Sequence, residues 1–228
     1  MKHIGRYLPL FFLVLCCIQI AVAQSAFDLN VGFGAAQDKA ASTGLDQNTL
    51  LNCTSGSSCV KTPGLSAFMM GAGGDLMLWK HFGLGAQYTS QPARQKYAVL
   101  QPAAVSLGQP EIDLQSRVSF FDFNGIYQPI SSKKASLQLG GGVGFANLKF
   151  YENVNGSNAV FGSFNQSQYA GSSNHFLVHG GIGVQIFVTD HIYIKPQFDI
   201  HYVHNFSQFG SNLVKAEMVW IGYSFGDR

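Results

Sequence analysis

The sequence contains few charged residues. Only 11% of its 228 residues are Asp, Glu, Lys or Arg, whereas an ordinary soluble domain has roughly a quarter. The formal net charge is +2, too small to provide the basic surface that nucleic-acid binding requires. We therefore expect no nucleic-acid partner.

After residue 23 the chain also lacks a long hydrophobic run. No stretch approaches the roughly 18 consecutive apolar residues of a membrane-spanning helix. Glycine is frequent, with 26 residues, and aromatic residues make up 13% of the chain. Glycine weakens helix interiors, which disfavours a helical bundle, and the aromatic content argues against disorder. The composition favours a single folded domain rich in strands.

The first 23 residues have the three-part layout of a secretory signal peptide. Two basic residues precede an apolar run over residues 8–20, and small alanines flank Val22 before Gln24. The run is shorter than the roughly 20 residues that span a bilayer as a helix. We predict that residues 1–23 are removed and that residues 24–228 form one exported domain.

Two of the four cysteines, Cys53 and Cys59, lie in the exported part. In an exported protein such a close pair predicts one disulfide bond. Two free thiols are the alternative. A metal site is disfavoured because no histidine or further cysteine is near the pair in sequence.

Apolar residues alternate with polar residues or glycine in eight segments of the exported domain. Each segment is about as long as a tilted strand that crosses a bilayer. The connections alternate between long and short, and the long ones cover residues 36–64, 91–116, 152–173 and 204–212. This pattern predicts an all-β fold, an eight-stranded antiparallel up-and-down transmembrane β-barrel with short periplasmic turns and long extracellular loops.

The two faces of these strands differ in composition. One face is apolar, and the other carries glycine and polar residues but few of the Lys and Glu residues that a soluble surface has. We therefore expect the apolar face to contact lipid and the polar face to fill the interior. The expected lipid-facing residues include Ile192, Ile194, Phe198, Ile200, Val219, Ile221, Tyr223 and Phe225. The expected interior network includes Asp28, Asp75, Asp122, Lys195, Asp199 and His201.

The segment over residues 219–225, VWIGYSF, resembles the closing strand of bacterial outer-membrane barrels. Residues 120–124 and 188–197 are similar to segments of a bacterial subgroup of such barrels. Over residues 25–225 the chain resembles the small eight-stranded superfamily that includes OmpX and the membrane domain of OmpA. The resemblance implies a bacterial outer-membrane location, surrounding lipid and lipopolysaccharide, and insertion by the barrel-assembly machinery.

We expect a plugged barrel that anchors its long loops, above all residues 36–64 and 91–116, for an extracellular partner. No catalytic residue, cofactor or metal is expected, and the histidines over residues 175–204 match no strong metal-binding spacing. One alternative is a narrow pore. Another is a lipid A-modifying enzyme that uses His204, Ser207 and Glu217. A third is a soluble lipocalin-like barrel with an apolar interior.

Overall fold

The computed structural model describes residues 26–38, 65–100, 111–158, 162–206 and 211–226. These residues form nine antiparallel strands: β1 (Phe27–Asp38), β2 (Ala67–Met77), β3 (Phe82–Ser90), β4 (Gln95–Leu100), β5 (Glu111–Ser131), β6 (Ala135–Asn158), β7 (Gly162–Phe187), β8 (Ile192–Val203) and β9 (Leu213–Phe225). No helix in this part of the chain is long and apolar enough to cross a membrane.

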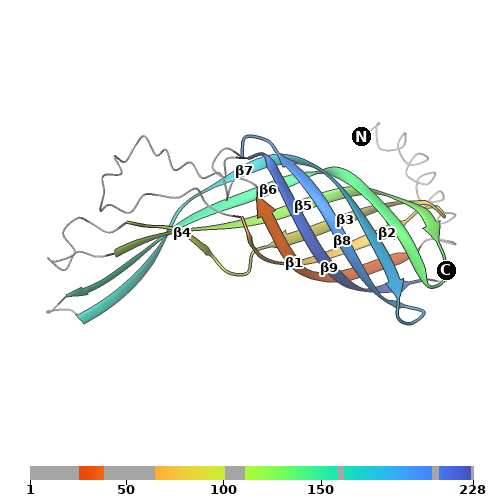
Figure 1. The fold of residues 1–228 in the computed structure, drawn as a ribbon, viewed down its shortest axis with the longest axis horizontal. Helices are drawn as coiled ribbons and strands as arrows, with labels where there is room; N and C mark the ends of the chain where they lie inside the picture. The colour runs from red at the N-terminus through yellow and green to blue at the C-terminus, as the bar shows by residue number, and fades with distance from the viewer. Residues whose placement is uncertain (1–25, 39–64, 101–110, 159–161, 207–210, 227–228) are drawn as a thin grey trace, which may run out of the picture.

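Eight of these strands close into a barrel (Figure 1). β1 pairs with both β2 and β9, and β3 pairs with β5, which completes the ring. β4 lies outside the ring and pairs with the first part of β5. The predicted eight-stranded antiparallel barrel is confirmed, and β4 is an additional strand inside the connection predicted over residues 91–116.

Side chains of the barrel strands alternate between the outer surface and the interior. The six outward positions Ile192, Ile194, Ile200, Ile221, Tyr223 and Phe225 are exposed, and the outward Phe198 and Val219 are half-buried. Neighbouring positions such as Tyr193 and Trp220 are fully buried. The apolar side chains therefore surround this part of the barrel, which is the arrangement of a membrane barrel and the reverse of a lipocalin-like one.

Aromatic rings gather on the outer surface at the end of the barrel with the short turns. Phe27 and Phe225 have ring centroids 5.9 Å apart, and Tyr223 lies 4.7 Å from Phe225. Phe82 stacks on Tyr127 at 5.0 Å. Such rings form the girdle of an outer-membrane barrel where lipid meets water.

Pro196 interrupts one of the two ladders that β8 makes. The β8–β9 ladder runs through Pro196 opposite Val219. The β7–β8 ladder instead passes from Gly183 opposite Gln197 to Ile186 opposite Ile194, without pairs at the two intervening positions. Because proline has no backbone N–H to donate, the ladder opens at this point. The register is the same on both sides, so the barrel absorbs the proline without a bulge.

The strands β5, β6 and β7 extend well beyond the ring, as Figure 1 shows at the end with the long connections. The connection predicted over residues 152–173 was wrong, because β6 and β7 pair there up to Asn158 opposite Gly162. This segment is rich in Asn, Ser and Gly and lacks the alternation of a strand with one buried face. Outside the membrane both faces of a strand meet water, so pairing there requires no apolar face.

Candidate functional site

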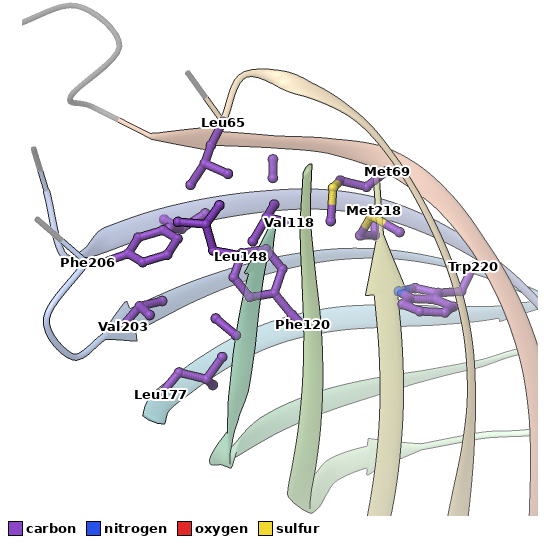
Figure 2. Packing of buried hydrophobic residues seen from close by; sticks show 13 residues of the cluster. Leu65, Met69, Val118, Phe120, Leu148, Leu177, Val203, Phe206, Met218 and Trp220 are labelled. Carbon is purple, nitrogen blue, oxygen red and sulfur yellow. The ribbon is translucent and has the colours of Figure 1, made fainter. Parts of the chain in front are cut away.

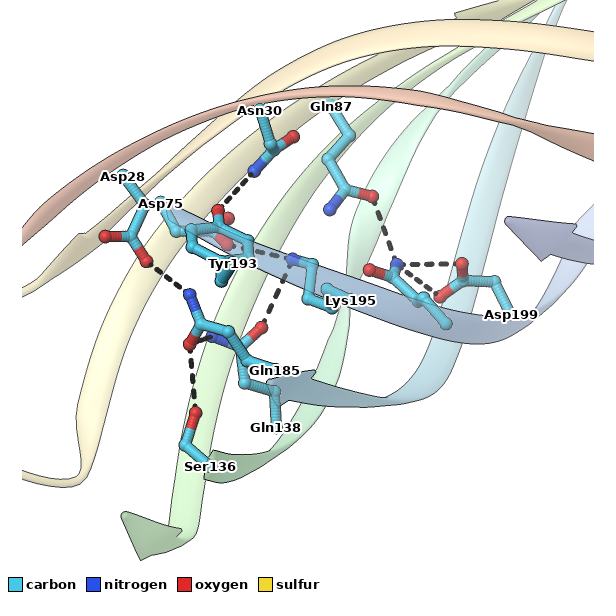
Figure 3. A network of polar contacts seen from close by, with 11 residues as sticks. Asp28, Asn30, Asp75, Gln87, Ser136, Gln138, Gln185, Tyr193, Lys195 and Asp199 are labelled. Atoms are coloured by element: carbon cyan, nitrogen blue, oxygen red, sulfur yellow. Dashed lines mark hydrogen bonds and ion pairs between the residues drawn. The ribbon is translucent and has the colours of Figure 1, made fainter. Parts of the chain in front are cut away.

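The membrane-spanning part of the interior holds a polar network (Figure 3). The Nζ atom of Lys195 lies 3.0 Å from Oδ2 of Asp75 and donates to Oε1 of Gln138 at 3.2 Å. Lys195 and Asp75 are each 1% exposed. A buried charge is tolerated only when it is paired, so this ion pair fixes β2 against β8 across the lumen.

The network continues toward the short turns. The amide of Gln185 donates to Oδ2 of Asp28 at 3.0 Å, and the hydroxyl of Ser136 donates to Oε1 of Gln185 at 2.9 Å. The amide of Asn30 donates to the Tyr193 hydroxyl at 3.3 Å. The Gln185–Asp28 and Asn30–Tyr193 bonds join strands that are not neighbours in the ring, so these polar side chains pack across the lumen as a hydrophobic core packs across a soluble barrel.

The six predicted interior residues are all buried, and they fall into two groups. Asp28, Asp75 and Lys195 belong to the network near the turns. Asp122, Asp199 and His201 lie farther along the lumen, where Nε2 of His201 is 3.3 Å from Oδ2 of Asp122. Gln197, which the predicted set did not include, donates to both carboxylate oxygens of Asp199 at 3.0 and 2.8 Å.

The interior is not polar throughout, contrary to the expectation of a polar filling. Toward the long connections it holds an apolar cluster, shown in Figure 2. We call it the apolar plug, and it consists of Ala36, Leu65, Met69, Val118, Phe120, Ala146, Leu148, Leu177, Val203, Phe206, Val214, Met218 and Trp220. Two members, Leu65 and Phe206, come from the ends of connections and not from strands.

The sequence marks the boundary of the plug by a reversal in the phase of the alternation. In β5 the inward side chains change from polar Asp122 to apolar Phe120 and Val118. Over the same positions the outward side chains change from apolar Phe121 to polar Ser119. The same exchange occurs in β6 and β9, where the polar outward residues are Asn147 and Lys149, and Lys215 and Glu217. Strands that leave lipid for water take on a soluble pattern, with apolar side chains inside and polar ones outside.

The reversal divides the barrel into a membrane-embedded part and a water-exposed part around the apolar plug, which we call the collar. Beyond the collar, β4 and the outer parts of β5, β6 and β7 form a sheet, which we call the extension. The ladder between β6 and β7 shifts by one residue between Phe150 and Tyr151. A bulge bends a strand and increases its twist, so it redirects the extension away from the barrel wall.

Aromatic and charged contacts hold the extension together. The guanidinium of Arg94 lies 3.8 Å from the ring centre of Tyr151 and donates to the Ser167 hydroxyl at 2.5 Å. Tyr151 in turn packs edge-on against Tyr169, with centroids 5.8 Å apart. These contacts connect the segment before β4 to both long strands, so the extension has a defined shape.

A second set of contacts joins β4, β5 and β6. Lys96 lies 2.6 Å from Oδ1 of Asp113, and the amide of Asn155 donates to Oδ2 of Asp113 at 3.3 Å. The Lys96 side chain is nearly half exposed, so the pair contributes at most about 1 kcal/mol. It nevertheless fixes the register of the outer strands.

The residues considered for chemistry are dispersed. Of the residues considered for a lipid A-modifying enzyme, Glu217 faces outward, His204 is exposed, and Ser207 lies outside the described residues. The predicted disulfide partners Cys53 and Cys59 also lie outside the described residues. Among the histidines, His175 contacts the Ser173 hydroxyl at 2.8 Å and the His204 carbonyl at 3.1 Å. His179 and His201 lie farther along the lumen, where they pair with each other across β7 and β8.

This geometry defines the class of protein: a β-barrel with an apolar belt, aromatic girdles and a filled lumen, as in the bacterial outer membrane. Comparison with family models gives the family. Residues 8–225 match the outer membrane protein beta-barrel domain, and the chain belongs to this family. No curated protein matches the sequence.

Several solved structures are similar to this chain. A major outer membrane protein from Thermus thermophilus is 9% identical, with a TM-score of 0.52 over 88% of this chain and 99% of the other. Ail, the attachment invasion locus protein of Yersinia pestis, solved with the heparin analogue sucrose octasulfate, is 13% identical, with a TM-score of 0.49 over 89% and 99%. The outer membrane protease OmpT from Escherichia coli is 11% identical, with a TM-score of 0.41 over 88% and 97%. At these identities the likeness concerns the fold alone.

Proposed function

We propose that this protein is a non-catalytic surface protein whose barrel anchors the collar and the extension for binding an extracellular partner. The observation that carries the proposal is the reversed alternation in β5, β6 and β9, together with the apolar plug beneath it. A chain that acted only within the membrane would gain nothing from a water-exposed collar with its own core.

The filling of the lumen supports an anchor over a narrow pore. A conducting barrel needs a continuous aqueous path. In the described interior, the cavity lined by Asp75, Lys195 and Asp199 has a volume of about 20 Å³. This is room for about one water molecule. Beyond it the path meets the apolar plug, whose members Trp220 and Phe120 are at most 1% exposed.

The extension has the composition of a recognition surface. Residues 152–174 consist largely of Asn, Ser, Gly and Gln with interspersed Phe and Tyr. Side chains 163–170 are all exposed, and Phe164 and Tyr169 are among them. Tyr supplies rigid contact area, and Ser, Gly and Asn supply adaptable hydrogen bonds at protein-binding surfaces. We infer that the partner is a protein surface, while lipid and lipopolysaccharide surround the apolar belt and the assembly machinery recognises β9.

Planar-bilayer recordings test the closed barrel. The protein purified in detergent is added to a bilayer, and we expect no conductance steps of defined size. A matched variant that carries Phe120→Ala and Trp220→Ala removes two large members of the plug. Steps from the unaltered protein would refute the anchor and favour the pore.

Adhesion of intact cells to protein-coated surfaces tests the extension. A variant in which residues 153–167 are replaced by a two-residue turn keeps the barrel and removes the outer hairpin, because Asn153 pairs with Ser167. We expect this variant to lose adhesion at equal surface abundance, while Lys133→Ser in a short turn at the opposite end does not. Equal adhesion of the shortened variant would refute the surface role. Altered lipid A masses in cells that express the protein would favour the enzyme instead.

A further inference from the structure

Three buried side chains from three strands converge midway along the lumen. Asp122 of β5, His179 of β7 and His201 of β8 each offer one ligand atom, and these atoms lie within 4.8 Å of one another. The two imidazole rings stack with centroids 5.3 Å apart and an interplanar angle of 18°. Each of the three residues is at least nine-tenths buried.

Four polar atoms of this cluster lack hydrogen-bond partners among the described residues. Both ring nitrogens of His179, Nδ1 of His201 and Oδ1 of Asp122 are buried without a hydrogen bond. The one printed contact within the cluster joins Nε2 of His201 to Oδ2 of Asp122 at 3.3 Å. A buried polar group without a partner destabilises the folded state, because it has lost its hydrogen bonds to water. Their convergence therefore indicates a bound species that the polypeptide itself does not supply.

The charges around the cluster favour a cation. Asp199 lies near enough to interact electrostatically with His179, His201 and Asp122. Lys195 is the one buried lysine or arginine among the described residues, and Asp75 pairs with it. Two carboxyl groups, those of Asp122 and Asp199, therefore lie at the cluster, and the nearest buried lysine is already paired elsewhere.

The local backbone leaves room between these side chains. On β6, Gly142 pairs with His179 on one side and with Asn124 on the other. A Cβ at the next inward position, Gly144, would lie 3.0 Å from Oδ1 of Asp122. A side chain at Gly144 would therefore crowd the Asp122 carboxyl group. The cavity near Lys195 is also lined by His179 and Asp199, so it borders the cluster.

We propose that Asp122, His179 and His201 bind one divalent transition-metal ion of the zinc class. Two imidazoles and one carboxylate are a ligand set of such ions, with water completing the coordination. Calcium and magnesium require more oxygen ligands than the cluster offers. The ion would join β5, β7 and β8 at the level where the polar network meets the apolar plug. The site is independent of the proposed surface role.

Titration with zinc tests the site. The protein is purified from outer membranes without a polyhistidine tag, treated with a chelator, and titrated with ZnCl₂ in a calorimeter. We expect saturable binding of one ion per chain and an increase in the unfolding temperature on loading, because an ion that binds the folded state stabilises it. His179→Gln and His201→Gln should each weaken binding at least tenfold, and the exposed His204→Gln should leave it unchanged.

Two further measurements keep the test decisive. Heat-modifiable gel mobility reports whether each variant is folded, so that a lost site is distinguished from a lost barrel. X-ray absorption at the zinc edge of the unaltered protein counts the imidazole ligands, and two are expected. Absence of saturable zinc binding, a stoichiometry unchanged by both histidine variants, or a spectrum without two imidazoles would overturn the proposal.

Discussion

Replacement of Lys195 by methionine tests whether the lumen is a packed polar core. The side chain is 1% exposed, and its Nζ atom lies 3.0 Å from Oδ2 of Asp75 and 3.2 Å from Oε1 of Gln138. Met has a similar length, so the variant removes the charge with little change in volume. It leaves the Asp75 carboxylate buried without its cation. Breaking a buried pair in this way costs about 3–5 kcal/mol of the free energy of unfolding.

Urea unfolding in lipid vesicles measures this loss, with tryptophan fluorescence and heat-modifiable gel mobility as two probes. The matched control is Lys133→Met in the exposed β5–β6 turn, which should change stability by less than about 0.5 kcal/mol. The double variant Asp75→Asn/Lys195→Met no longer has a buried carboxylate without its cation. Its free energy of unfolding should therefore exceed that of Lys195→Met alone by at least about 1 kcal/mol. A loss below about 1 kcal/mol for Lys195→Met would show that bulk water solvates the Asp75 carboxylate, and it would refute a lumen packed with side chains.

Three other predictions test the rest of the architecture by the same unfolding assay. Gly142→Ala should cost about 1–3 kcal/mol, because its Cβ would clash with the Phe123 carbonyl oxygen. Gly140→Ala, with nothing within 4 Å of its Cβ, should be near neutral, and equal effects would contradict the placement of β6 against β5. Ile221→Arg should cost about 2–4 kcal/mol if the outward face of β9 meets lipid near the midplane, and a neutral result would place this position in water. Trp220→Ala should cost about 3–5 kcal/mol, and a loss under about 1 kcal/mol would mean that the plug is loosely packed.

The barrel itself could be predicted because its signals are local. Period-two alternation and the order of long and short connections depend on neighbouring residues, and each barrel strand was expected at about the right place. The same alternation predicted whether a side chain faces the lumen or the outer surface. Lys195 is buried in the lumen and the neighbouring Ile194 is exposed on the outside, as expected. The scarcity of Lys and Glu then indicated which side met lipid.

The apolar plug was missed although its signal is present. The prediction treated each strand as having one apolar face along its whole length, whereas the faces exchange between Phe120 and Phe121. The sequence signal of this exchange is a pair of adjacent aromatic residues, one facing inward and the other outward. Adjacent apolar residues elsewhere in the chain have other causes, so one sequence without aligned relatives does not single out this pair.

The extension and the histidine cluster depend on long-range placement. Residues 152–173 have little intrinsic propensity for β-strand formation. They form paired strands because the barrel already aligns β6 with β7. His179 and His201 are far apart in sequence and meet only because the short β7–β8 turn sets the register. Asp122 joins them from across β6, which no spacing rule for metal ligands describes.

The hairpin of β6 and β7 makes the barrel a natural carrier for foreign peptides. From Tyr151 to Asn158 the paired strand adds roughly 25 Å beyond the bulge at about 3.3 Å per residue. A sequence grafted at its tip would be displayed on a paired hairpin, away from the barrel ring. The ring closes by pairing of β3 with β5, which lies within the barrel and away from the tip of the hairpin. We therefore expect a grafted peptide to leave barrel assembly unchanged.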